Sequence, residues 1–419
     1  MTRGLVFSAQ GFMKRRDFLG ATAALLALLG QDAVAAPRKK AAPKPRAARK
    51  PAKPAPVKKP AGPAARTAYT PVTERPPEGS SASRLPPVKA PEAPTDWRNF
   101  EITTTITLPR SAGVTQLWLP LPLNQDTLFQ RTIAHRWTSN AGEASLQRLP
   151  DGDLETCVCQ WPAGIEPRLE LTTTVATADR HFDITRRTMP PEREDILRRN
   201  LQSSLLIPND GQAHALAERI VGRVRDPVAQ AKAIYDWIVD NTTYSPDRPA
   251  AGSGDVRAQF NSGAFGGRSA DINGLFVALC RAIGIPARCV YGLRVGSSRL
   301  FRNLGLTDNN ATAAQHCRAE FYIPGYSWIP VDPSDVRRAI AYEGLSDQDS
   351  KLQALRRILF GVWEMNWVAY NIGADLTLPG STERVPNFFL PRAQNGEGVR
   401  DGRDPANFRF TISARPSFT

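Results

Sequence analysis

The chain has 419 residues, and its 54 Lys and Arg residues outnumber its 40 Asp and Glu residues, for a formal net charge of +14. Eleven of the basic residues lie between positions 37 and 66, where no acid occurs, residues 1–36 carry a further +2 and residues 67–95 are neutral, so residues 96–419 carry a net charge of only about +1. Because no aromatic residues interleave with this basic run, nucleic-acid binding is excluded as the main function. Five cysteines without a C-x-x-C pair and four scattered histidines predict neither a disulfide framework nor a catalytic metal, and no cofactor is expected.

Residues 1–35 have the pattern of a twin-arginine signal peptide. Arg15 and Arg16 precede an apolar run, and residues 33–35 (Ala-Val-Ala) have the small-x-small form that a signal peptidase cleaves. The run is shorter than the ~20 residues of a membrane-spanning helix, although a retained anchor is the alternative. The sequence therefore predicts cleavage near Ala35 and a periplasmic or otherwise exported protein whose mature form has no stable membrane span.

Residues 36–95 are mostly Pro, Ala, Lys and Arg. Such a composition cannot bury enough apolar surface to offset the entropy lost on folding, so we expect a disordered linker. Two roles remain open for it. The basic run could contact anionic envelope polymer or lipid headgroups, or it could be a solvated spacer.

Residues 96–190 are predicted to form a β-sandwich domain. Apolar and polar residues alternate over 100–108, a second strand is expected at 115–120, and a third at 169–175. Cys157 and Cys159 stand two apart in a strand-like stretch, which places both on one face and favours buried packing over reactive thiols.

After residue 190 the apolar period becomes helical, and residues 191–419 are assigned to a second domain with a C-terminal extension. One helix is expected around 213–221 and another after Asp226, which is a plausible N-cap followed by Pro227. The stretch from Trp363 to Asn371 is unusually aromatic and polar for a core helix, and either packing or a place in a cleft wall would account for it.

The block from Gly266 to Arg288 carries the most information. It is a glycine-rich turn, a helix with apolar residues facing inward, a Gly stop and a strand that begins near Ala287. Two further strands are expected at 316–322 and 327–331, joined by a turn that contains Pro324 and Gly325.

Three residues of this region could form a catalytic triad. Ser269 stands at the start of the helix, where the helix dipole stabilises an anionic nucleophile or an oxyanion. His316 and Asp332 stand on or beside adjacent strands, where a carboxylate can orient an imidazole and the imidazole can reach the helix end. The alternatives are an N-cap serine and a structural histidine.

Four blocks of this region resemble the core of the transglutaminase-like superfamily over residues about 230 to 337. They are Gly267-Arg268-Ser269-Ala270-Asp271, Leu275 through Arg288, His316-Cys317-Arg318-Ala319-Glu320 and Trp328-Ile329-Pro330-Val331-Asp332-Pro333. The resemblance implies an α+β protein in which the N-terminal β-sandwich is followed by a papain-like core. In that core, the helix that bears the nucleophile position packs on an antiparallel sheet.

The sequence departs from the family pattern at two positions. The family carries a cysteine nucleophile two residues before the aspartate that matches Asp271, and here that residue is Ser269. A serine hydroxyl is far less reactive than a thiolate in a site built for sulfur, because its proton must be removed during the attack. Cys280 and Cys317 are expected to be packing residues rather than substitutes. The second departure is Arg318, where many relatives have tryptophan.

Two functions follow from these residues. The first is an envelope-side peptidase, amidase or acyltransferase on peptide amides, with Ser269 as nucleophile, His316 as general base and acid, and Asp332 orienting the imidazole. Backbone N–H groups of the Ser269 turn, or an upstream side chain, would hold the oxyanion. The second is a catalytically silent module that binds peptide or peptidoglycan stem in the family cleft. The expected partner is a peptide or protein, with cell-wall peptide as one option. A weaker third hypothesis makes the basic linker the functional element.

Overall fold

The computed structural model describes residues 94–149, 152–182 and 189–417. The predicted signal peptide and all but the last two residues of the predicted linker lie outside these ranges. Within the described residues, no helix combines the length and the apolar character needed to cross a bilayer.

Two antiparallel sheets form a β-sandwich. The strand order of the first sheet is β19 (Arg409–Ser417), β1 (Arg98–Thr107), β6 (Arg168–Thr177) and β3 (Gln130–Ser139). The order of the second is β18 (Gly398–Asp401), β17 (Arg392–Asn395), β2 (Thr115–Pro120), β5 (Leu154–Trp161) and β4 (Glu143–Leu149). Buried residues of both sheets share one apolar cluster, including Ile106 and Leu171 from the first and Leu117, Cys157 and Cys159 from the second. The two cysteines therefore pack in the sandwich core.

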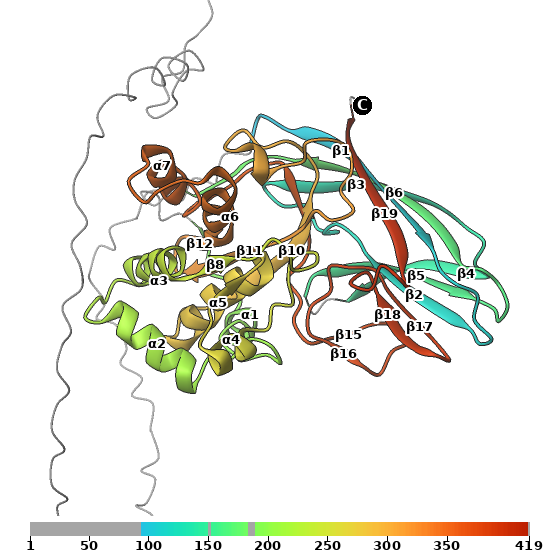
Figure 1. Ribbon diagram of the computed structural model, residues 1–419, viewed down its shortest axis with the longest axis horizontal. Helices are drawn as coiled ribbons and strands as arrows, with labels where there is room; N and C mark the ends of the chain where they lie inside the picture. The colour runs from blue at the N-terminus through green and yellow to red at the C-terminus, as the bar shows by residue number, and fades with distance from the viewer. Residues whose placement is uncertain (1–93, 150–151, 183–188, 418–419) are drawn as a thin grey trace, which may run out of the picture. The chain divides into compact units, whose positions relative to one another are not determined.

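The sandwich contains strands from both ends of the described chain. β19 pairs along its whole length with β1, and β17 pairs with β2. Figure 1 shows the red C-terminal strand beside the blue-green strands of the first sheet. The predicted division into 96–190 and 191–419 assigns these C-terminal strands to the second domain. The difference arises because pairing between strands some 300 residues apart leaves no local pattern in the sequence.

The second half of the fold is built on a four-stranded antiparallel sheet. Its strand order is β12 (Ser327–Val331), β11 (Gln315–Ile323), β10 (Ala287–Arg294) and β14 (Trp367–Asn371). Of the two roles left open for 363–371, packing is the one that the structure shows, because Trp367 to Asn371 is an entirely buried strand that pairs with β10. Its aromatic residues and Val368 have the strand preference that makes the stretch unusual for a helix.

Seven helices of the described chain belong to this half. They are α1 (Glu194–Arg199), α2 (Gly211–Val221), α3 (Pro227–Asn241), α4 (Val256–Ser262), α5 (Ser269–Ala282), α6 (Pro333–Glu343) and α7 (Ser350–Ile358). The expected cap of α3 is present, since the Asp226 side chain accepts from the Ala229 N–H at 2.8 Å. The short strands are β7 (Arg180–His181), β8 (Thr243–Tyr244), β9 (Gly266–Gly267), β13 (Val362–Trp363), β15 (Leu376–Thr377) and β16 (Arg384–Val385), and a 3₁₀ turn covers Arg302–Leu304.

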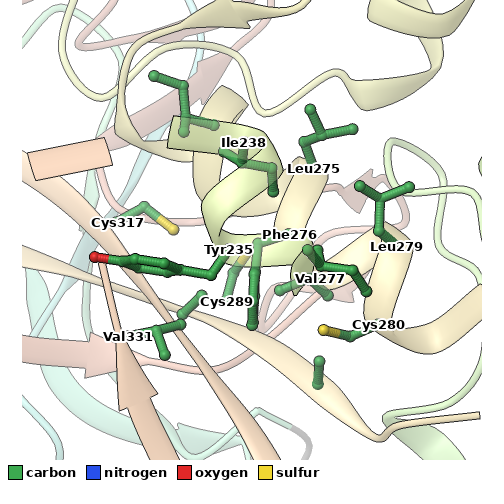
Figure 2. Close-up of a cluster of buried hydrophobic side chains, with 14 of the residues drawn as sticks. Tyr235, Ile238, Leu275, Phe276, Val277, Leu279, Cys280, Cys289, Cys317 and Val331 are labelled. Atoms are coloured by element: carbon green, nitrogen blue, oxygen red, sulfur yellow. The ribbon is translucent and has the colours of Figure 1, made fainter. Parts of the chain in front are cut away.

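Helix α5 forms the centre of this core. All its residues from Ser269 to Arg281 are buried, as expected for a helix enclosed on every side. It packs against β10 and β11 on one side and against α2 and α3 on another. Figure 2 shows Phe276 and Val277 of α5 near Tyr235 of α3 and the thiols of Cys280, Cys289 and Cys317. The cysteines of this region are therefore core residues, and the expected papain-like arrangement of helix on antiparallel sheet is confirmed.

Candidate active site

The turn before α5 is held in place by Asp271. Its Oδ2 accepts from the backbone N–H of Arg268 at 2.9 Å, and its Oδ1 accepts from the N–H of Gly254 at 2.8 Å. Gly267 has φ +131°, and a Cβ there would lie 2.3 Å from Asp271 Oδ2, so only glycine fits. This turn sets Ser269 as the first residue of the helix, as predicted, with 3% of its surface exposed.

His316 and Asp332 meet as the sequence predicts. His316 stands on β11, and Asp332 follows the end of the neighbouring strand β12. Their Nε2 and Oδ2 atoms are 2.7 Å apart, and both residues are buried. The Asp332 Oδ1 accepts from the side chains of Asn273 at 3.1 Å and Ser334 at 2.7 Å, so the carboxylate is fixed from both sides.

The other ring nitrogen of His316 is occupied by an arginine. Nδ1 lies 3.0 Å from the NH2 group of Arg294, the last residue of β10. Because a guanidinium can only donate, Nδ1 accepts this bond, and the proton of the neutral ring therefore resides on Nε2 and points to Asp332. The imidazole consequently has no free nitrogen to receive a proton from a nucleophile.

Ser269 is bonded elsewhere. Its Oγ accepts a hydrogen bond from the backbone N–H of Cys317 at 3.0 Å, and no hydrogen bond joins it to His316 among the described residues. The amide of the next residue, Ala270, donates to the carbonyl oxygen of Ala251 at 2.8 Å. The structure therefore brings His316 and Asp332 together but leaves the serine and the neighbouring amide engaged with backbone groups.

The sequence interpretation missed three residues that complete this cluster. Arg294 forms an ion pair with Asp335 at 2.5 Å, and Asn273 Nδ2 donates to the Cys317 carbonyl oxygen at 2.8 Å. Asp335 Oδ2 lies 3.7 Å from His316 Nε2. Two of the three had a weak signal in the sequence, since Asn273 is one helical turn after Ser269 and Asp335 stands three residues after Asp332. Arg294 had none, because it is 22 residues from His316 and belongs to no motif.

Arg318, the second departure from the family pattern, is also part of the buried cluster. Its guanidinium lies 4.7 Å from the ring centroid of Trp367, and its Nε is 3.6 Å from Asp332 Oδ2. Burial, only partly offset by Asp332 and Asp335, lowers the pKa of Arg318 to about 10, so it stays charged at neutral pH. The side chain packs in the interior and does not form an exposed cleft wall.

Burial and the surrounding arginines make His316 a very weak base. Loss of hydration, followed by repulsion from Arg294, holds the pKa of His316 well below its usual range, and the attraction of Asp335 does not offset them. For Arg294, burial acts to lower the pKa, but Asp335 outweighs it and raises the pKa above the ordinary value. The cluster thus pairs charged arginines and aspartates around a neutral imidazole.

His316, Asp332 and Asp335 are the one group in the described chain with the side-chain types and proximity to hold a metal ion, with one ligand atom of each within 4.8 Å of the others. The charges around them do not suit a cation. Arg294 and Arg318 already neutralise the two carboxylates, and a divalent ion would have to displace both guanidinium groups.

The low basicity of His316 predicts a pH dependence of stability. His135, half-buried in the sandwich beside Glu155, also has a pKa held below its usual range, chiefly by its partial burial. Since the unfolded chain takes up these protons at about pH 6.5 and the folded chain does so only at lower pH, the free energy of unfolding should fall as the pH drops below about 6.5. The slope can reach about 1.4 kcal/mol per pH unit for His316, whose pKa is held well below its usual range, and is smaller for His135.

Urea unfolding at several pH values measures this slope. His316→Gln and His135→Gln should each remove part of it, whereas the exposed His181→Gln should leave it unchanged. An unfolding free energy that rises toward pH 5.5 would contradict the neutral, buried state of both rings.

Comparison with known proteins places this geometry in a family. The model of the transglutaminase-like superfamily matches residues 214–333. An uncharacterized protein of Haemophilus influenzae is 32% identical over 343 residues, which covers 76% of this chain and 92% of that protein.

Solved structures with a similar fold are more distant. A proposed cysteine protease from Cytophaga hutchinsonii is 18% identical with a TM-score of 0.43, covering 77% of this chain and 99% of that one. The periplasmic domain of TgpA from Pseudomonas aeruginosa is 19% identical with a TM-score of 0.30, covering 66% and 90%. Because its core matches the family model, and because it aligns with 92% of the Haemophilus influenzae protein, the chain belongs to the transglutaminase-like superfamily.

Proposed function

We propose that this protein is a catalytically silent member of its family, which binds peptide outside the cytoplasm. The observation that carries the proposal is the hydrogen bond from Arg294 to His316 Nδ1. In a triad, one imidazole nitrogen bonds the carboxylate and the other takes the proton of the nucleophile. Here Asp332 occupies the first nitrogen and a permanently charged guanidinium occupies the second.

The nucleophile position supports the same conclusion. A serine hydroxyl needs a general base at the moment of attack, and the pKa of His316 is held too low, by burial and by Arg294, for effective proton removal. The Ser269 oxygen is also buried and accepts the Cys317 N–H, an arrangement suited to a structural serine. The serine at the nucleophile position and the arginine bonded to the imidazole each oppose catalysis.

Peptide as the ligand follows from the family, whose enzymes act on peptide amides. The predicted twin-arginine signal supports an exported location, and the basic segment 37–66 suits contact with anionic envelope polymer or lipid headgroups. Peptide binding in the exported compartment is therefore the function that we assign to the folded part of the chain.

Hydrolysis through Ser269 is a second candidate, favoured by the retained 2.7 Å contact between His316 and Asp332. A peptide-binding module does not need this pair for chemistry. The pair can be retained for a structural reason instead. Asp332 also caps α6, because its side chain accepts the Asp335 N–H at 3.1 Å.

Activity assays on the native protein and Ser269→Ala distinguish the two candidates. Hydrolysis of fluorogenic peptide amides and transfer of cadaverine to casein are expected to stay at the uncatalysed rate for both proteins. Ser262→Ala, on the exposed end of α4, is the matched control. Turnover by the native and control proteins that disappears in Ser269→Ala would establish the serine hydrolase and overturn the silent assignment.

A further inference from the structure

Two guanidinium groups converge on Tyr244 beside the start of α5. The guanidinium carbon of Arg268, the residue before Ser269, lies 5.7 Å from the Tyr244 ring centroid, and that of Arg338 on α6 lies 5.6 Å from it. Arg338 is also 5.1 Å from the ring of Tyr342, which is 53% exposed. Together with Arg248, these arginines form a surface that we call the arginine rim (Arg248, Arg268 and Arg338).

The rim side chains are fixed in place by neutral groups. Arg338 donates from NH1 to the Tyr244 hydroxyl oxygen at 2.6 Å and from Nε to the Asn303 carbonyl oxygen at 2.7 Å. Arg268 donates from NH1 to the carbonyl oxygens of Pro246 at 2.9 Å and of Arg248 at 2.8 Å. Both arginines are partly buried, so each is held in one position while some of its surface stays open to solvent.

Neither Arg268 nor Arg338 has a carboxylate within 4.0 Å in the part of the chain that the structure describes. This distinguishes them from the half-buried Arg288 and the buried Arg294, which have ion pairs with Glu320 and Asp335 at 2.5 Å. A guanidinium that is ordered without a counter-ion retains N–H groups for an anion from outside.

Of the three rim arginines, only Arg248 has a carboxylate within 4.0 Å among the described residues. Asp271 is buried, lies 3.7 Å from Arg248 NH1 and is already bonded to the turn before α5. Glu343 accepts from the Asn303 side chain at 2.7 Å, and Asp247 is exposed in the loop before Arg248. Arg248 itself has 52% of its side chain exposed. The three rim arginines and the exposed Tyr342 thus lie near the turn that precedes Ser269, the position of the family nucleophile.

We propose that the arginine rim binds carboxylate groups, so that the ligand of this protein is an acidic peptide. The inference rests on the proposed peptide-binding function and names the class of peptide. Arg268 and Arg338 each keep an NH2 group that can donate to a carboxylate oxygen, since their bonds to neutral groups use NH1 and Nε. Little side-chain entropy is lost on binding because both side chains are already ordered. Tyr342 offers an apolar face for the adjoining part of the peptide.

Isothermal titration of the full mature chain with two synthetic peptides tests the inference. One peptide is a capped alanine-glycine sequence with two glutamates, and the other has glutamine in their place. The native protein should bind the glutamate peptide at least about 10-fold more tightly. Arg268→Gln and Arg338→Gln should each reduce that preference several-fold, while Arg223→Gln, an exposed arginine after α2, should leave it unchanged.

The comparison among variants controls for the rest of the chain. Every variant carries the same basic segment 37–66, so any attraction of that segment for acidic peptides cancels. Thermal unfolding of each variant shows whether the fold is retained.

The outcomes separate this inference from the function on which it rests. Equal binding of the two peptides, or an equal loss of preference in Arg223→Gln, would overturn the arginine rim and leave peptide binding standing. Absence of binding by either peptide would count against peptide binding itself. A preference for glutamate that falls only in Arg268→Gln and Arg338→Gln supports both.

Discussion

Ser269→Cys alone is expected to leave the protein inactive, whereas Ser269→Cys combined with Arg294→Met and Asp335→Asn should hydrolyse peptide amides at least about 100-fold faster than the single variant. The single substitution supplies the family's thiol, but Arg294 still occupies His316 Nδ1. Removing the guanidinium frees that nitrogen and withdraws a charge that opposes protonation of the imidazole. Asp335→Asn avoids leaving a buried carboxylate without its partner.

Alkylation by iodoacetamide reports the same change without a substrate. The native protein is a suitable blank because all five of its cysteines are buried. The introduced thiol should react faster in the triple variant at neutral pH, since a freed imidazole can accept its proton. Ser269→Cys with Arg193→Met and Asp195→Asn, an exposed ion pair elsewhere, is the matched control and should behave as Ser269→Cys alone. High activity of Ser269→Cys by itself would show that Arg294 does not block the site.

The contact between His316 and Asp332 could be predicted because it depends on local features. Each residue belongs to a recognisable block, and the strands that bear them are joined by the short turn around Gly325, which makes them antiparallel neighbours. The start of α5 at Ser269 could be predicted for the same reason, since a glycine-rich turn, an apolar helical period and a Gly stop follow one another in the sequence.

Arg294 could not be predicted, because its role depends on register. β10 pairs with β11 so that Gly292 is opposite His316, and Arg294, two residues further along β10 on the same face, lies diagonally beside the imidazole. A shift of one residue would turn the guanidinium to the other face of the sheet, and nothing in the sequence of a fully buried strand sets that register. The sandwich strand β19 was missed for a related reason, since its partner β1 stands at the opposite end of the described chain.

Arg294→Met alone is expected to lower the free energy of unfolding by about 3–5 kcal/mol, the usual cost of leaving a buried charge without its partner. The guanidinium has three partners: Asp335 at 2.5 Å, His316 Nδ1 at 3.0 Å and the carbonyl oxygen of Leu304. Asp335 is buried, so its carboxylate cannot regain hydration when the arginine is removed.

Urea unfolding of a double-mutant cycle with Asp335→Leu measures how much of that cost belongs to the ion pair. If the buried charge is the cause, Arg294→Met/Asp335→Leu should be substantially more stable than Arg294→Met alone, because no charge is then left unpaired. The exposed pair of Arg193 and Asp195 provides the comparison, and its removal should cost less than about 1 kcal/mol. A loss of that small size for Arg294→Met would mean that the arginine is not a structural element. Arg294 could then move away from His316 Nδ1 and leave that nitrogen free to accept a proton from a nucleophile. The proposal that the protein is catalytically silent would lose its physical basis.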